Sequence, residues 1–224
     1  MLVLLIAGLL AGAAPSPLEM ARDQQDRGAL QNLVNDYSAA AARTPNDAGA
    51  QYLAALASSY LAEVALEVRD RKQAEQAAVR GVKLAERAVA LKPETAEYYR
   101  VLGTLCGQVV PANVLTGLSY GKRAQEAINK AVEKDPKLAG VYVARGVGNY
   151  YLPPALGGGV ELAIADFRKA LQLDAKSAEA YLWLGLSLRK ENKNAEARQA
   201  FGKSLELNPN RIWVKQQLDK TPTK

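Results

Sequence analysis

The feature that most constrains the fold of this chain is a spacing that occurs five times. A small or apolar residue is followed by others four, seven and twelve positions later. The sets are Leu33/Tyr37/Ala40/Pro45, Gly81/Ala85/Ala88/Pro93, Ala124/Ile128/Ala131/Pro136, Ala163/Phe167/Ala170/Ala175 and Ala197/Phe201/Ser204/Pro209. The first three residues of each set share one stripe of a helix, and a proline five residues later cannot continue that helix. The spacing therefore predicts a repeat array in which each set marks the buried face and the end of one helix.

The repeating units become shorter toward the C-terminus. The last positions of successive sets lie 48, 43, 39 and 34 residues apart. The extra residues fall between the first and the second helix of each unit, so we expect the insertions to emerge along one edge of the array. In the first unit the additional length is expected to extend both helices, because residues 55–90 contain no proline and one glycine.

The last unit, residues 178–211, carries a recognisable signature on both of its predicted helices. Its positions are Tyr181, Leu184, Gly185 and Leu188, followed by Ala197, Phe201, Ser204 and Pro209. This pattern resembles the tetratricopeptide repeat, in which small residues allow two antiparallel helices to approach closely. The resemblance implies an all-α fold, an α-solenoid of antiparallel helix pairs wound into a right-handed superhelix.

The same comparison divides the chain into consecutive units. Residues 1–17 read as a signal peptide cleaved after Ala13, because an apolar run ends in the small-residue pattern Ala11-x-Ala13. The predicted units are an isolated second helix in residues 18–47, a degenerate repeat with a long insertion in 48–95, repeats with insertions in 96–138 and 139–177, a regular repeat in 178–211, and a capping helix with a tail in 212–224.

The signal peptide predicted in residues 1–17 implies a periplasmic or secreted protein. The segment resembles a bacterial lipoprotein signal with Ala13 in place of the lipidated cysteine, so a lipid anchor is not expected. The alternative is that residues 1–17 remain as an uncleaved membrane anchor.

Composition excludes most catalytic chemistry. The chain has no histidine and one cysteine, Cys106, at a position expected in the core, so no catalytic residue, metal ligand or cofactor is predicted. The net charge is +6, but acidic and basic residues alternate. Nucleic-acid binding is therefore not expected, whereas a peripheral contact with a membrane surface remains open.

Binding in this family usually occurs on the concave face formed by the first helices. Its register assigns to this groove Arg100, Thr104, Val143, Val147, Tyr150, Leu182, Leu186 and Arg189. Val143, Val147, Leu182 and Leu186 form an apolar strip where solvent is expected. Such a strip suggests an extended peptide, a partner helix or an acyl chain.

Two polar residues occupy core positions of the unit in residues 139–177. Arg145 and Asn149 stand where the last repeat has leucines. In one interpretation, Arg145 is satisfied by loop carbonyls or by a carboxylate such as Glu161 or Asp166, and it then only fixes the neighbouring loop. In the other, Arg145, Asn149 and Tyr151, with Asn113 from the preceding insertion, line a ligand pocket under the insertions.

The sequence therefore predicts a non-catalytic scaffold of the bacterial cell envelope that binds a protein or peptide partner in its groove. The alternative is a small-molecule or lipid-like ligand-binding protein associated with transport. The oligomeric state does not follow from the sequence.

Overall fold

The computed structural model describes residues 15–112 and 114–223, in which all the regular elements are helices. The α-helices are α1 (Pro17–Asp23), α2 (Arg27–Arg43), α3 (Ala48–Glu67), α4 (Arg71–Leu91), α5 (Ala96–Val109), α6 (Val114–Lys134), α7 (Ala139–Tyr151), α8 (Val160–Leu173), α9 (Ala178–Lys190), α10 (Asn194–Leu207) and α11 (Ile212–Asp219). Two 3₁₀-helices, η1 (Val110–Ala112) and η2 (Pro154–Leu156), precede α6 and α8.

A proline follows the second helix in four of the five pairs, as the spacing predicts, and Ala175 stands at this place after α8. Helices α2, α4, α6 and α10 each stop two residues before a proline, at Pro45, Pro93, Pro136 and Pro209. The residue before a proline is disfavoured in the helical region, and Lys92 and Asn208 indeed leave it with ψ near 79° and 85°. The predicted helix ends are therefore confirmed.

A second recurring turn joins the two helices of a pair. In α1–α2, α3–α4 and α9–α10 one residue adopts a left-handed conformation, with φ of 54° at Gln25, 65° at Arg69 and 62° at Asn192. The next amide then bonds back into the first helix, as in Asp26 N to Ala21 O at 2.8 Å. Residues 18–47 are thus a short pair, α1 and α2, and the expectation of an isolated second helix is corrected.

The pair α3–α4 has longer helices than the last pair, α9–α10. Helices α3 and α4 contain 20 and 21 residues, whereas α9 and α10 contain 13 and 14. The additional length of the first complete pair therefore extends both of its helices. In the pair α7–α8, the additional residues form a loop around η2. Gly157 and Gly159 in this loop have φ values of 86° and 125°, which favour glycine.

In the pairs α7–α8 and α9–α10, the two helices approach closely because a glycine faces an aromatic ring. A Cβ atom at Gly185 would lie 2.7 Å from the ring of Phe201, and one at Gly146 would lie 2.5 Å from the ring of Phe167. Both phenylalanines are fully buried. The role predicted for Gly185 is therefore confirmed.

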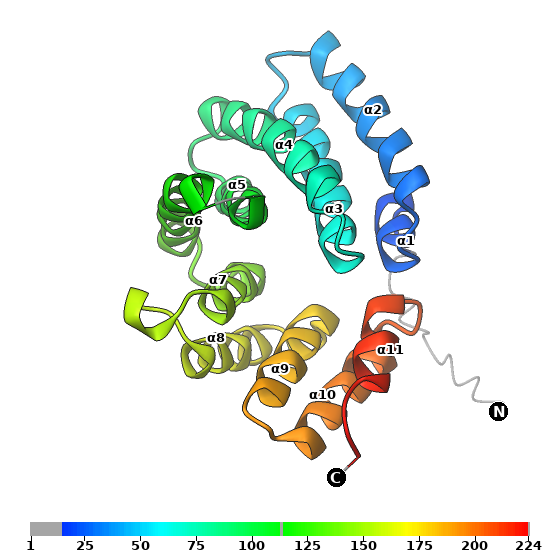
Figure 1. Ribbon diagram of the computed structural model, residues 1–224. Helices are drawn as coiled ribbons and strands as arrows, with labels where there is room; N and C mark the ends of the chain where they lie inside the picture. The colour runs from blue at the N-terminus through cyan, green and yellow to red at the C-terminus, as the bar shows by residue number, and fades with distance from the viewer. Residues whose placement is uncertain (1–14, 113, 224) are drawn as a thin grey trace, which may run out of the picture.

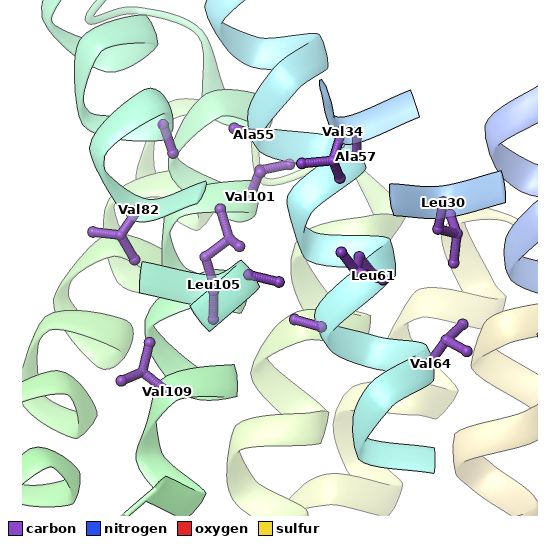
Figure 2. Packing of buried hydrophobic residues seen from close by; sticks show 14 of the residues in the cluster. Leu30, Val34, Ala55, Ala57, Leu61, Val64, Val82, Val101, Leu105 and Val109 are labelled. Carbon is purple, nitrogen blue, oxygen red and sulfur yellow. The ribbon is translucent and has the colours of Figure 1, made fainter. Parts of the chain in front are cut away.

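The buried apolar side chains form three clusters that follow one another along the chain. The first joins α1 to α5, with Leu30, Leu61 and Leu105 in its centre, as Figure 2 shows. The second holds residues of α5 to α9, and the third extends from α7 to α11. Each pair is therefore held to its neighbours by apolar packing, as in other solenoids.

The pairs curve into a ring that brings the two ends of the described chain together (Figure 1). The first helices α3, α5, α7 and α9 lie inside this ring, and α2, α4, α6, α8 and α10 lie outside. We call the contact between α1–α3 and residues 207–217 the seam. The inner surface of the ring is the concave face on which the groove was predicted.

The close helix approach leads to a stability prediction. Gly185→Ala should lower the free energy of unfolding by about 1–3 kcal/mol, because the added methyl overlaps Phe201. Gly202→Ala, in α10, is the matched control, since no atom lies within 4 Å of the Cβ position there. The control should be neutral or stabilising by up to about 1 kcal/mol. Urea unfolding followed by circular dichroism measures both, and equal effects would contradict the packing argument.

Candidate functional site

Between the inner helices α3 and α5, three polar side chains form a hydrogen-bonded network. Tyr52 Oη donates to Glu97 Oε1 at 2.9 Å, and Arg100 donates to both oxygens of Glu97 at 2.5 and 2.6 Å. Tyr52 also stacks on Tyr98, with ring centroids 5.1 Å apart. Burial would lower the pKa of Arg100, but Glu97 holds it above the ordinary value. Arg100 is therefore a charged groove residue that Glu97 already neutralises.

Thr104, the next groove position on α5, is used within its own helix. Its hydroxyl donates to the carbonyl of Arg100 at 2.9 Å. Helical register alone does not predict the bond between Glu97 and Tyr52, because that contact depends on how α3 packs against α5.

Four aromatic rings gather where α7, α9 and α11 meet. Trp183 lies 5.7 Å from Tyr150, 6.0 Å from Tyr151 and 5.6 Å from Trp213, between ring centroids. The rings meet edge to face, the arrangement that aromatic pairs prefer. Trp183 is buried and donates its indole N–H to Glu179 at 2.8 Å. We call Tyr150, Tyr151, Trp183 and Trp213 the aromatic cluster.

Tyr151 is the accessible member of the aromatic cluster, with 68% of its surface exposed. The surrounding protein raises the pKa of its phenol to about 12, mainly by desolvation, so the ring stays neutral at physiological pH. Tyr150 is held more firmly, because the ammonium of Lys190 lies 4.4 Å from its ring and donates to its carbonyl at 3.0 Å. The cluster therefore offers one free aromatic side chain on a rigid base.

Part of the predicted apolar strip is not accessible. Leu182 and Leu186 are 0% and 4% exposed, whereas Val143 and Val147 are half-buried. The leucines belong to the apolar cluster that includes Val214 of α11. The expectation of a solvent-exposed strip is thus wrong for its two leucines, because α9 and α11 pack into one core.

Arg189, predicted to line the groove, instead forms hydrogen bonds with α11. Its guanidinium donates to the carbonyl of Gln217 at 3.0 Å and to the side chain of Gln217 at 2.8 Å. A cationic side chain that binds carbonyl oxygens near the end of a helix stabilises that end. Arg189 therefore fixes the terminal helix to α9.

The two polar residues on α7 share one partner. Arg145 binds both oxygens of Asp166, with contacts of 2.5 to 3.1 Å, and Asn149 donates to the same carboxylate at 2.9 Å. Asp166 is nearly buried, while the Arg145 side chain is 38% exposed. The interpretation in which a carboxylate satisfies Arg145 is confirmed, with Asp166 as that carboxylate.

The structure does not assemble the predicted pocket. Tyr151 packs with Tyr150 and Trp183 instead of with Arg145, and Asn113 lies outside the described residues. Two shallow depressions, of about 330 and 390 Å³, are lined by other residues. One lies beside Cys106, which is fully buried and whose thiol has its pKa raised to about 11 by burial. That thiol is a core residue, as predicted.

The seam holds the densest set of charges in the described part of the chain. Arg211, 2% exposed, donates to Glu67 and, at 2.5 Å, to Glu63, both on α3. Its Nη1 also donates to the carbonyl of Arg22 at 3.3 Å, and its Nε lies 3.7 Å from Asp23. Sequence reasoning placed Arg211 only at the end of the last repeat, and nothing local to it signals partners more than 140 residues away.

Two neutral side chains extend the seam. Asn208 donates to Asp23 at 2.7 Å, and Gln216 donates to Gln25 at 3.1 Å. Gln25 in turn donates to Glu67 at 2.7 Å. Arg22 binds Asp23 at 2.8 Å and lies 4.8 Å above the ring of Tyr60. The ends of the ring are therefore joined through a connected polar network.

Neither a membrane-spanning helix nor a metal-binding cluster is found among residues 15–112 and 114–223. No helix there is both long and apolar enough to cross a bilayer. Likewise, that part of the chain has no group of three or more histidine, cysteine, aspartate or glutamate side chains placed to hold a metal ion.

The Arg145–Asp166 pair gives a direct test of its structural role. Arg145→Leu should lower the free energy of unfolding by about 1–3 kcal/mol, because the nearly buried Asp166 carboxylate loses its charged partner. Arg168→Leu, at an exposed position of α8, is the control and should change stability by about 0.5 kcal/mol or less. Thermal and urea unfolding measure both. Unchanged stability of Arg145→Leu would return the residue to the ligand-pocket interpretation.

The seam should respond to pH through Glu63. Burial raises the pKa of this carboxyl from 4.5 to about 7, against the opposing effect of Arg211. Because the folded pKa is raised, the contribution of Glu63 to stability is fully present below pH 4.5 and is lost as pH rises through 7. Arg22, Asp23, Glu67, Glu179 and Arg211 are the charged groups facing it.

We therefore expect the melting temperature to fall more between pH 5 and pH 8 in the unsubstituted chain than in Glu63→Gln, which resembles the protonated acid. Glu206→Gln, in an exposed pair with Lys203, is the control and should keep the original pH profile. Differential scanning fluorimetry across this range measures all three proteins. A Glu63→Gln profile as steep as the original would contradict the assignment.

Comparisons with known proteins agree with the fold. Residues 178–211 match the family model of the tetratricopeptide repeat. A thermophilic TPR protein of Thermus thermophilus is 20% identical, with 91% of this chain and 96% of that chain covered and a TM-score of 0.63. The HusA haemophore of Porphyromonas gingivalis is 17% identical, with 80% and 96% covered and a TM-score of 0.61. No curated protein sequence matches this chain. Residues 178–211 therefore match one tetratricopeptide repeat, and the chain as a whole is similar in fold to a tetratricopeptide-repeat protein.

Proposed function

We propose that this protein is a non-catalytic interaction scaffold of the bacterial cell envelope, and that its concave face binds an extended segment of a partner protein. The observation that carries the proposal is Tyr151, a largely exposed aromatic side chain at the end of the inner helix α7, in contact with Tyr150 and Trp183. Aromatic residues that are accessible on a rigid base are typical of the residues that dominate binding energy in interfaces.

The remaining inner surface favours a polypeptide. Tyr52, Glu97 and Arg100 offer hydrogen-bonding groups on α3 and α5, whereas the aromatic cluster belongs to α7, α9 and α11. An extended segment can contact both regions, with an apolar side chain on Tyr151 and main-chain amides near Glu97. The fold provides such a surface but does not identify its occupant.

The envelope location is part of the proposal and rests on the sequence. The apolar run of residues 1–14 and the Ala11-x-Ala13 pattern support export.

A small planar ligand is the second candidate, because it could stack on the exposed ring of Tyr151 beside Tyr150 and Trp183. HusA, whose fold is similar, is a haemophore. At 17% identity the likeness shows the fold alone, so the support for this candidate comes from the aromatic cluster.

Photo-crosslinking tests the proposed partner. The substitution Tyr151→p-benzoylphenylalanine should give a discrete protein adduct on illumination in a bacterial host that carries the native partner, because the probe sits on the concave face. Lys83→p-benzoylphenylalanine, at an exposed position of the outer helix α4, is the control and should not give that adduct. Identical adducts at both positions would contradict binding on the inner face. A small molecule retained in native mass spectrometry, without an adduct, would favour the second candidate.

A further inference from the structure

The seam differs in chemistry from every other junction of the ring. Adjacent helix pairs share buried apolar side chains, in clusters centred on residues such as Leu105 and Phe201. Among the described residues, none of these three clusters contains members from both sides of the seam. The ends of the ring are joined instead by Arg211, Asn208 and Gln216.

Closing the ring at a polar junction of this kind yields only a small net gain in free energy over the open form. Burying the guanidinium of Arg211 with the carboxyl groups of Glu63, Glu67 and Asp23 removes these groups from water, and the attraction between them largely repays that cost. Apolar burial has no comparable opposing cost and is the dominant favourable term elsewhere in the ring. The seam is therefore the junction at which the ring separates first.

Closure also decides what can reach the concave face. While Arg211 is bound, the inner helices lie inside a ring whose ends are joined (Figure 1). These helices include α5, with Glu97 and Arg100, and α7, with Tyr150 and Tyr151. An extended segment with folded domains on both sides cannot enter a closed ring from the side. Separation of α11 from α1 and α3 removes this restriction without disturbing the apolar clusters.

We propose that the seam is a gate: the ring opens and closes at Arg211, and the open form admits a partner segment to the concave face. The gate as a conformational change stands on the seam itself, whereas its role in partner entry rests on the function proposed above. Binding energy of a partner that requires the open form would shift the population toward it.

Double electron–electron resonance tests the conformational part. In the Cys106→Ser background, nitroxide labels at Asp36→Cys on α2 and Lys203→Cys on α10, both exposed, report the distance across the seam. Labels at Asp36→Cys and Lys83→Cys, on the same side of the seam, provide the reference distance. Arg211→Gln should lengthen and broaden the distance across the seam while the reference distance stays unchanged.

Two further variants distinguish gating from unfolding. Glu67→Gln removes a partner of Arg211 from α3 without touching α11, and should lengthen the same distance. Arg123→Gln, which removes an Arg–Glu pair between the neighbouring helices α4 and α6, should leave it unchanged. A single short distance in Arg211→Gln and Glu67→Gln alike, with native circular dichroism, would overturn the gate. So would a change in the reference distance, since that indicates general unfolding.

The functional part has its own readout. With the probe at Tyr151, Arg211→Gln should increase the yield of the partner adduct several-fold over Arg123→Gln. An adduct of equal yield in an opened ring would overturn the role in entry while the proposed scaffold function stands. The absence of any adduct, with the distance change observed, would contradict that function and leave the opening of the seam established.

Discussion

The close approach of two helices within each pair is the constraint on which the rest of the structure depends. Gly146 and Gly185 each lie directly under the ring of a buried phenylalanine on the second helix of the same pair. This contact sets the distance between the two axes, and the apolar clusters then repeat the geometry from one pair to the next. The curvature of the ring is therefore the accumulated result of local packing, and the meeting of its ends follows from that curvature.

Where the ends meet, the balance of forces changes. A fully buried apolar side chain contributes about 1.5–3 kcal/mol at each ordinary junction. A buried ion pair such as Arg211 with Glu63 and Glu67 gives back most of its attraction as desolvation. Loss of one partner nevertheless leaves a charge buried without compensation, which costs about 3–5 kcal/mol. The seam thus contributes little net stability, but replacing one of its charged side chains is costly.

The sequence determines local features of this fold more clearly than distant ones. Helix ends at Pro45 and Pro93 and the small residue at Gly185 follow from covalent geometry and packing within one pair, so the pattern predicts them. Helix α1 was missed because its turn uses Gln25 with positive φ, where no glycine marks the site. Leu182 and Arg211 depend on contacts with α11 and α3, which only the assembled curvature brings together.

In the candidate site too, the sequence predicts local features but not contacts between distant residues. Register within the first helices predicted Arg100 and Tyr150 on the inner side, but their partners decide what each can offer a ligand. Glu97 neutralises Arg100 and Asp166 neutralises Arg145, so a partner gains little from pairing with either guanidinium. The exposed ring of Tyr151 has no ion-pair partner to lose, because a ligand that covers it displaces only water. Affinity on this face should therefore come from the aromatic cluster, with the satisfied ion pairs restricting which segments fit beside it.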